Sequence, residues 1–229
     1  MAKRLTALAL LIMLLVLPLV SQAGTFNTTH ATAYMEIKFL CGCTRGGTGA
    51  MIGRRGLVTA AHNLYCSTHG QKLDYCNFYF GAKSANSCWY RYSGRFSYRA
   101  YDHFANGYSS ENDIGYVIFD SPVGDETGWF GWMTGYDSDV DQEFMNVLSY
   151  DNKRHLQNIY EIGYIRSSKQ IYWPGWISGT DGGPVYLSGE GMDYYVIAVY
   201  TSHDSYGNGY GRRLTSDIIE DMKANGAFN

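Results

Sequence analysis

Short apolar segments separated by turn residues are the feature that most constrains the fold of this chain. Segments rich in Tyr, Val, Ile and Phe recur between clusters of Gly, Ser, Asn and Asp. This regular spacing is typical of an all-β sandwich or barrel, because each short strand ends in a turn. The expected strands are residues 33–40, 49–52, 57–60, 77–80, 114–119, 144–149, 159–165, 184–187 and 194–200.

One helix is expected, close to the C-terminus. Residues 214–224 begin with Thr215 and Ser216, either of which can cap a helix N-terminus. Three apolar residues in this stretch share one face at helical spacing: Ile218, Ile219 and Met222.

Length and composition exclude several classes of protein. The 229 residues are enough for one domain or two packed lobes, and no linker or repeat divides residues 24–229. With 18 basic and 21 acidic residues, a broad nucleic-acid-binding surface is not expected. A hydrophobic content of 45% argues against intrinsic disorder, and 27 Gly with 21 Tyr argue against a coiled coil.

Residues 1–23 have the pattern of a secretory signal peptide. Lys3 and Arg4 precede an apolar run over residues 5–20, and Ala23 ends a short stretch of small residues suited to cleavage. The apolar run of about 16 residues is shorter than the roughly 20 that a membrane-spanning helix needs. We therefore expect cleavage after Ala23, no stable membrane anchor, and a secreted domain of residues 24–229 in the extracellular space or the periplasm.

Five cysteines agree with export to an oxidising compartment. Two disulfides and one remaining thiol are expected there. The cysteine spacings match none of the usual zinc patterns, which have paired C-x-x-C motifs or trailing histidines, so no metal site and no cofactor are expected. The cysteines are Cys41, Cys43, Cys66, Cys76 and Cys88.

Two segments carry residues suited to proton transfer. Residues 57–62 place His62 at the end of a strand, with two alanines before it that leave the imidazole room for a partner. Asp113 directly precedes an apolar strand, where its carboxylate can be buried and can hold a histidine by the Nδ1 hydrogen. Taken singly, each is better explained by a structural role, as a packed histidine or an aspartate in a turn.

A third segment has the character of a nucleophile turn. In residues 176–185, glycines flank the single position Asp181 in a tight turn that leads into a strand. The backbone N–H groups of Gly179 and Asp181 are placed to converge on a developing oxyanion. Glycine-rich turns are common, but the conjunction of the three segments in this order is not.

The three segments together resemble the motifs of the chymotrypsin-like (trypsin-fold) serine proteases. Residues 59–62 match the histidine motif, residues 112–114 the aspartate motif and residues 179–184 the nucleophile motif, in the family's order. The resemblance covers roughly residues 35–225 and is nearest to the secreted glutamyl-endopeptidase-like branch. It implies two six-stranded antiparallel Greek-key barrels with a short C-terminal helix, a monomer, and a peptide or protein as substrate or ligand.

The chain departs from this family at the nucleophile, where Asp181 stands in place of serine. Attack by a carboxylate on a peptide bond would give a mixed anhydride, which is more reactive than the amide. Carboxylates on both sides of His62, from Asp113 and Asp181, favour the imidazolium and should raise its pKa above about 6.5. The resemblance therefore implies a trypsin-like protease homologue that is inactive or severely impaired, a binding or regulatory pseudoprotease.

Two other functions stay open. The chain is an active serine-type endopeptidase if another nucleophile or water replaces the serine, or it holds a divalent metal between His62, Asp113 and Asp181, because one imidazole and two carboxylates suit zinc. Binding through a surface is supported by tyrosines and arginines that are favoured at interfaces, although packing in strands and loops is the preferred explanation of the same residues. They are Tyr90, Tyr92, Tyr98, Tyr101, Tyr108, Arg91, Arg95 and Arg99.

The resemblance also assigns a specificity pocket. Its floor falls on Gly175, so no acid is present there to select Lys or Arg, and the neighbouring Trp176 either fills the pocket or packs in the core. Glutamyl endopeptidases carry a histidine at the position of Tyr200, so a preference for glutamate is not supported, and Thr201 follows on the strand beside the pocket.

The family's usual disulfide near the histidine motif implies a matching pair in this chain. That bridge joins the strand before the motif to a cysteine directly after the histidine. The corresponding residues are Cys41 or Cys43 with Cys66, and we expect Cys43–Cys66. A second bridge is expected between Cys76 and Cys88.

Overall fold

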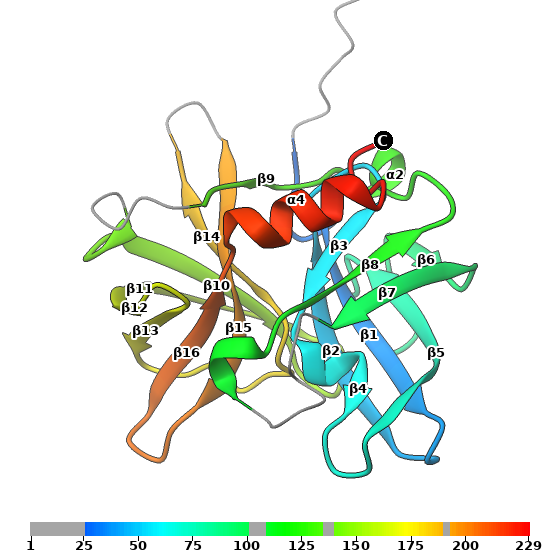
Figure 1. The fold of residues 1–229 in the computed structure, drawn as a ribbon, viewed down its shortest axis with the longest axis horizontal. Coiled ribbons are helices and arrows are strands. Elements are labelled where there is room, and N and C mark those ends of the chain that lie inside the picture. Colours follow the sequence, from blue (N-terminus) through cyan, green and yellow to red (C-terminus); the bar gives the residue numbers. More distant parts are fainter. Residues whose placement is uncertain (1–25, 101–108, 135–139, 190–192) are drawn as a thin grey trace, which may run out of the picture.

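The computed structural model describes residues 26–100, 109–134, 140–189 and 193–229. The expected signal peptide, residues 1–23, lies outside the described residues. Two curled β-sheets stand side by side, the first built from the N-terminal half of the chain and the second from the C-terminal half (Figure 1). The predicted all-β class is confirmed.

The first sheet has the order β4-β5-β1-β2-β3-β8-β7, with β6 paired to β5. Its long-range pairings, β1 with β5 and β3 with β8, join hairpins that are distant in sequence. Its strands are β1 (Thr32–Phe39), β2 (Thr44–Met51), β3 (Gly56–Thr59), β4 (Tyr65–Cys66), β5 (Gln71–Phe80), β6 (Tyr90–Tyr92), β7 (Phe96–Ala100) and β8 (Gly115–Phe119).

The second sheet has the order β11-β10-β14-β15-β16-β13-β12, with β9 paired to β15. Every pairing in the two sheets is antiparallel except that of β9 with β15. Its strands are β9 (Gly131–Trp132), β10 (Phe144–Tyr150), β11 (Leu156–Ile162), β12 (Tyr164–Ser167), β13 (Gln170–Pro174), β14 (Pro184–Ser188), β15 (Tyr194–His203) and β16 (Asn208–Arg213).

Each sheet contains eight strands where six were expected. In the first sheet the additional strands are the short β4 and β6. In the second sheet β9 is a two-residue edge strand, and β11 and β12 are one continuous segment interrupted only at Gly163. This bent segment occupies both ends of the strand order, which curls the sheet round on itself.

The helical elements are few and short. The expected C-terminal helix is confirmed as α4 (Ser216–Ala224), and its three predicted apolar residues are buried, although the Thr215 side chain makes no capping hydrogen bond. Within the described ranges, no helix is long and apolar enough to cross a membrane. The other helical turns that lie wholly within the described residues are η1 (Ala61–Asn63), η3 (Ser110–Asn112) and α2 (Gly124–Thr127).

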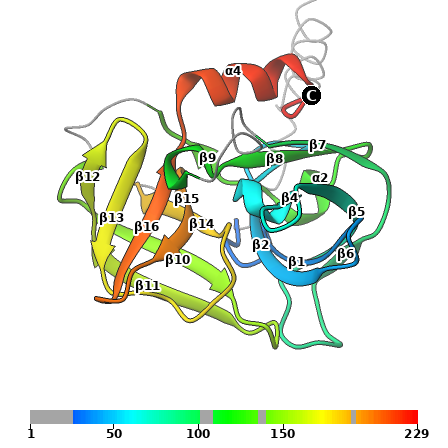
Figure 2. The same cartoon turned by 60° about the horizontal axis from the view of Figure 1, so that its bottom comes forward.

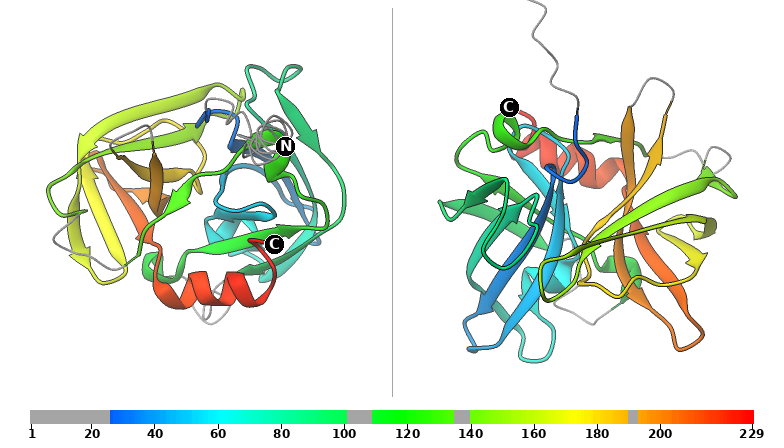
Figure 3. Two further views of the ribbon diagram at one scale, coloured as in Figure 1. Left: turned by 90° about the horizontal axis from the view of Figure 1, so that it is seen from above. Right: turned by 180° about the vertical axis from the view of Figure 1, so that it is seen from behind.

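Helix α4 links the two halves of the molecule. It follows β16 of the second sheet and lies across one end of the structure towards the first sheet (Figures 2 and 3). Asp221 of α4 accepts a hydrogen bond from the hydroxyl of Tyr116 on β8 at 2.6 Å. The apolar face of the helix belongs to the same buried cluster as the core of the first sheet.

Alternation along the strands separates buried from exposed side chains. On β1, Met35, Ile37 and Phe39 point into the apolar core of the first sheet. The second sheet surrounds its own core, in which Trp173 and Tyr200 are fully buried. The larger buried cluster also includes second-sheet residues such as Leu148 and Val199, so the two sheets pack against each other. The residues expected to carry chemistry lie at this boundary between the sheets.

Candidate functional site

His62 and Asp113 meet because the strands that carry them are paired. His62 lies in η1 directly after β3, Asp113 ends η3 just before β8, and β3 and β8 are antiparallel neighbours. The Nδ1 atom of His62 lies 2.7 Å from Oδ2 of Asp113, and the backbone N–H of His62 donates to Oδ1 at 3.0 Å. Both side chains are buried, and Asp113 is fully enclosed. The carboxylate therefore fixes the orientation of the imidazole from two directions.

Asp181 approaches the same imidazole from the second sheet. It lies in the loop before β14, and its Oδ2 atom is 3.3 Å from Nε2 of His62. The Asp181 side chain is 26% exposed, so this end of the site is open to solvent. Nε2 makes no hydrogen bond of standard geometry. The structure thus brings the three sequence-predicted residues into one line, carboxylate, imidazole and carboxylate.

Glycines let the loop carrying Asp181 pack tightly between the sheets. Gly182 has a φ of +97°, and a Cβ there would overlap the carbonyl oxygen of Thr48 on β2. A Cβ on Gly183 would overlap the carbonyl oxygen of Leu148 on β10. Since both obstacles are backbone atoms, no side-chain movement relieves them, and these positions require glycine.

A buried polar network that the sequence reasoning did not single out holds Asp181 in place. The Thr48 N–H donates to the Asp181 carbonyl at 2.9 Å, and Nδ2 of Asn63 donates to the same oxygen at 2.8 Å. Asn63 also donates to the hydroxyl of Thr59, which donates to the carbonyl of Thr48. Thr59 and Asn63 lie within three residues of His62 in the sequence. This closeness is the only sequence feature that could have identified them as part of the site.

The two carboxylates set the charge of His62. Burial by itself would lower its pKa, but the charge of Asp113, the hydrogen bond with it and the approach of Asp181 outweigh burial and raise the pKa of His62 to about 9. At neutral pH the ring therefore carries a proton on both nitrogens. The expected upward shift agrees with this geometry.

The predicted oxyanion donor Gly179 has another partner in this conformation. Its N–H donates to the carbonyl of Ile177 at 2.9 Å, and the next N–H, of Thr180, donates to Tyr150 at 2.7 Å. For Gly179 to bind an oxyanion, the peptide between Ser178 and Gly179 would have to turn. Its role, and that of the Asp181 N–H, stay predictions.

The four residues assigned to a specificity pocket have different environments. Gly175 adopts a φ of +96° in the turn after β13. Trp176 is 48% exposed and stacks on His203 with ring centroids 4.8 Å apart, so packing in the core is wrong for this residue. Tyr200 is fully buried, with its hydroxyl 3.2 Å from Nδ1 of His203, and Thr201 is buried beside it.

Asp181 and Arg45 line two hollows at the boundary between the sheets. One, of about 360 Å³, is walled by His62 and the turn of Ser67 and Thr68. The other, of about 420 Å³, is lined on the first sheet's side by residues 44–46 and on the second sheet's side by Asn152, Gly179 and Thr180. A peptide entering the boundary between the sheets would meet the Asp181 carboxylate at the centre.

A metal held by His62, Asp113 and Asp181 is not favoured by this arrangement. The imidazole lies between the carboxylates, with Nδ1 facing one and Nε2 facing the other. Their oxygens cannot converge on one ion while the ring separates them.

The expected disulfides are absent from the structure. All five cysteines are free thiols. Cys76 is buried in the core of the first sheet, whereas Cys88 packs against a separate aromatic cluster, so the expected Cys76–Cys88 pair is divided between two environments. Cys43 and Cys66 do come together, but in a group that also contains Cys41 and His69. The cysteine spacings did not predict this convergence with His69.

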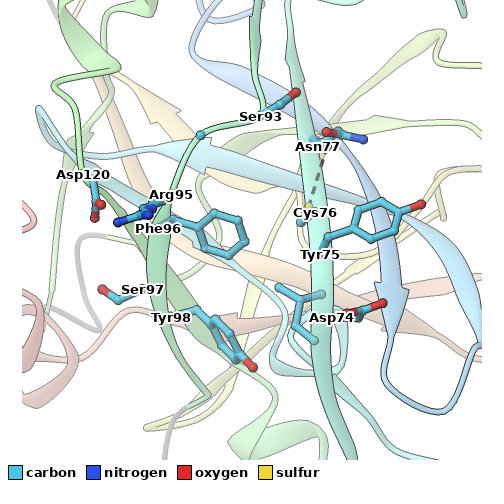
Figure 4. Close-up of a pocket in the computed structure, with 12 residues that line it drawn as sticks. Asp74, Tyr75, Cys76, Asn77, Ser93, Arg95, Phe96, Ser97, Tyr98 and Asp120 are labelled. Atoms are coloured by element: carbon cyan, nitrogen blue, oxygen red, sulfur yellow. Dashed lines mark hydrogen bonds between the residues drawn. The ribbon is translucent and has the colours of Figure 1, made fainter.

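A third hollow lies away from the histidine, on the first sheet. It has a volume of about 590 Å³ and lies where β5 faces the segment that leads into β7 (Figure 4). Arg95 and Tyr98, two of the residues considered for surface binding, line it. Tyr92 is instead buried, and Tyr101 and Tyr108 lie outside the described residues.

Comparisons with known proteins agree with this architecture. No protein-family model matches the chain. Among curated proteins, it is similar to the "Extracellular metalloprotease" of Bacillus subtilis (strain 168), at 24% identity over 202 residues. The match covers 85% of this chain and 63% of the relative, so the chain spans less than two thirds of that protein's length.

Solved structures show a stronger likeness in shape than in sequence. A Glu endopeptidase in complex with MPD matches 90% of this chain and 94% of its own, with a TM-score of 0.72 at 15% identity. The match with the thermostable serine protease AL20 from an extremophilic microorganism covers 88% of this chain and 99% of that one, with a TM-score of 0.74 at 14% identity. The match with Protease Anisep from Arthrobacter nicotinovorans covers 88% of this chain and 98% of that one, with a TM-score of 0.72 at 13% identity. The chain has the chymotrypsin-like serine protease fold.

Proposed function

We propose that this chain is a secreted protease homologue with severely impaired catalysis, which binds peptides or proteins at the boundary between its two sheets. The observation that carries the proposal is the placement of the Asp181 carboxylate 3.3 Å from Nε2 of His62. In the serine protease mechanism this nitrogen accepts the proton of the attacking hydroxyl. Here it faces a group that has no such proton to give.

The protonation state of His62 supports impaired catalysis. A pKa of about 9 leaves the imidazole charged at neutral pH, and an imidazolium has no lone pair with which to act as general base. A substitution that removes the Asp181 charge would restore part of that basicity, because Asp181 is one of the groups that raise this pKa.

The chemistry of the carboxylate supports the same conclusion. Asp181 lines both hollows, in which a substrate carbonyl would lie. Attack on an amide would replace it with a more reactive anhydride, so this step is uphill. In proteases that lack a triad member, oxyanion stabilisation and binding still leave about 10³- to 10⁴-fold acceleration over water. We therefore expect slow peptide hydrolysis rather than none.

An active endopeptidase is the second candidate, and the intact geometry of His62 with Asp113 favours it. Their 2.7 Å contact is the orienting half of a working triad. The three similar structures are all named as proteases: a Glu endopeptidase, a serine protease and Protease Anisep. The residue at 181 decides between the two candidates.

Secretion and a monomeric state belong to the same proposal. The pattern of residues 1–23 supports export, and the curated relative is named as extracellular. The larger buried cluster joins residues of both sheets within this one chain, which supports a monomeric state.

The test compares hydrolysis by the purified chain with that by its Asp181→Ser variant. Both are incubated with a pool of denatured peptides, and new termini are counted by mass spectrometry. We expect cleavage and labelling by a serine-directed phosphonate only in the Asp181→Ser variant, because it alone offers His62 a hydroxyl. A matched control, Asp151→Ser, changes an aspartate that pairs with the surface residue His155 and should gain neither property.

Multiple turnovers by the unchanged chain would contradict the proposal. A His62→Ala variant then assigns the activity, since only hydrolysis at this site requires the imidazole. Loss of cleavage in that variant would establish the active endopeptidase.

A further inference from the structure

Four side chains of the first sheet bring their ligand atoms together at one end of that sheet. Cys41 and Cys43 lie in the turn between β1 and β2, Cys66 ends β4, and His69 lies in the turn that follows. Their three Sγ atoms and one imidazole nitrogen all lie within 4.8 Å of one another. Among the described residues, no other group of three or more His, Cys, Asp and Glu side chains converges in this way.

The distances within the group fit a tetrahedral zinc ion. Nδ1 of His69 lies 3.4 Å from Sγ of Cys43 and 3.6 Å from Sγ of Cys66. Zinc bonds of about 2.3 Å to sulfur and about 2.05 Å to nitrogen, at tetrahedral angles, place sulfur and nitrogen about 3.6 Å apart. The distances from Nδ1 of His69 to the two sulfurs therefore already match those expected when all three atoms coordinate one zinc ion.

The backbone holds the two halves of the group side by side. β1 and β5 are paired, and the Leu40 N–H donates to the Lys72 carbonyl beside the group. Gly42, between the first two cysteines, has a φ of +85° with open space where a Cβ would lie. Its left-handed backbone turns the chain sharply between the two thiols, so that both reach the group.

We propose that Cys41, Cys43, Cys66 and His69 form a structural zinc site. Three thiolates and one imidazole are a donor set of closed structural zinc sites, which have no open position for catalysis. Binding releases one proton from each of the three thiols, and the neutral ring coordinates through Nδ1. This inference does not use the catalytic residues, and it can fail without affecting the proposed function.

A disulfide is the competing arrangement of the same residues. A bridge would use two of the three thiols and would leave the third, together with the imidazole, without a role. No disulfide joins these residues in the structure. A four-ligand metal site uses every member of the group, and for that reason we favour it.

The position of the group gives the metal a role beside the candidate site. Ser67 and Thr68 lie between two of the proposed ligands and form the wall of the hollow that contains His62 and Asp181. Arg45, which also lines the hollow, follows Cys43 by two residues. A zinc ion would cross-link these two segments and hold the width of the hollow fixed.

The test measures metal binding by the full chain and matched variants. We expect about one zinc per chain by elemental analysis after purification without chelators. Cobalt replacing zinc should give the intense visible bands of a tetrahedral thiolate site. His69→Asn should weaken cobalt binding more than about tenfold, since even indirect partners of a metal cost about that much. His69 is exposed, so this variant should fold.

Three further variants distinguish a zinc site from a cluster of thiols that binds no metal. Cys88→Ser removes a thiol outside the group, and His62→Ala removes the catalytic imidazole; both should keep the metal. His69→Cys supplies another zinc ligand and should restore binding with an altered cobalt spectrum, which a purely structural histidine would not produce. A chelator should lower the thermal midpoint of the unchanged chain but not of a metal-free variant.

Several results would overturn the zinc site. One is metal content below about a tenth of the protein, after refolding with zinc under reducing conditions. Another is zinc retained undiminished by both His69→Asn and Cys66→Ser. A third is a Cys43–Cys66 disulfide in the peptide map of the chain recovered from a secreting host.

Discussion

The Asp181 carboxylate contacts the imidazole of His62 across the boundary between the two sheets. The approach of Oδ2 to Nε2, at 3.3 Å, faces the shorter contact that Asp113 makes with the other ring nitrogen. The imidazolium therefore lies between two carboxylates, one supplied by each sheet. The charge of His62 therefore depends on how the two sheets pack, because His62 and Asp113 adjoin strands of the first sheet and Asp181 adjoins a strand of the second.

Removing the charge of Asp181 should make His62 less basic. In Asp181→Asn the side chain keeps its shape but no longer favours the imidazolium, so the pKa of His62 should fall below about 9. Titration of the ring signals by NMR measures the shift. Asp151→Asn is the matched control, because Asp151 is also 26% exposed and contacts a different histidine at 3.3 Å. Equal titration of His62 in the two variants would contradict this role for the Asp181 charge.

The same raised pKa makes stability depend on pH. The folded pKa of His62, about 9, lies above the unfolded value of about 6.5, so the stabilisation is fully present below pH 6.5 and is lost as pH rises through 9. The span corresponds to at most on the order of 3 kcal/mol. Urea unfolding between pH 6 and pH 9.5 should show this fall.

A pair of histidine variants assigns that pH dependence. His62→Gln should lower stability throughout but flatten its slope against pH, since no titrating ring remains between the carboxylates. His155→Gln, at a side chain that is 54% exposed, should keep the slope of the unchanged chain. An identical slope in both variants would assign the pH dependence to other groups.

The sequence predicted that His62, Asp113 and Asp181 form one site, because each lies in a motif and the three motifs have a fixed order. His62, Asp113 and Asp181 each adjoin a short apolar strand, and strand pairing brings those ends together. Strand β7 was missed because none of its residues is fully buried, so its apolar pattern is weak. Strand β13 has three buried residues but was also missed. Its apolar stretch is very short, because it is limited by Gln170 on one side and Pro174 on the other.

The convergence of three cysteines with His69 could not be obtained from spacing. Cys41 and Cys43 belong to the turn after β1, whereas Cys66 ends β4 and His69 lies in the turn that follows. They become neighbours only through the pairing of β1 with β5, whose register shifts between Lys38 and Phe39. A bulge of this kind redirects the strand end, and no local pattern announces which distant turn it will meet.

Free thiols at Cys76 and Cys88 are a direct consequence of their separate environments. Burial, aided by the charge of Glu36, raises the pKa of Cys76 well above its ordinary value, so it should resist alkylation in the folded chain. Cys88 is partly exposed and should react first. After unfolding without a reductant, both should be alkylated, as peptide mapping would show. A Cys76–Cys88 peptide pair in that map would restore the predicted disulfide.

Asn63 should contribute to stability and to the position of Asp181. Its Nδ2 donates to the Asp181 carbonyl and to the Thr59 hydroxyl, both in the buried network. Asn63→Ala should cost about 1–3 kcal/mol, because it removes both buried hydrogen bonds and leaves the Asp181 carbonyl with the Thr48 N–H alone. Asn158→Ala, on an exposed strand position, should change stability by less than about 0.5 kcal/mol. Similar unfolding midpoints for both variants would remove Asn63 from the network.

Gly183 should be required for the shape of the nucleophile turn. A Cβ at this position overlaps the carbonyl oxygen of Leu148, and a backbone obstacle yields only if the loop or β10 moves. Gly183→Ala should therefore lower stability by about 2 kcal/mol or more and displace the residue at 181. Gly189→Ala, where the nearest atom is the side chain of Tyr195, should be nearly neutral.

Placing these changes in the Asp181→Ser background separates position from stability. There the new hydroxyl should react with a serine-directed phosphonate only if the turn aims it at His62. Gly183→Ala should then lose the label at temperatures where circular dichroism still shows a folded chain, whereas Gly189→Ala should retain it. Undiminished labelling in the Gly183→Ala double variant would mean that the glycine serves packing alone, and that the aim of residue 181 is set by the hydrogen bonds that its carbonyl accepts from Thr48 and Asn63.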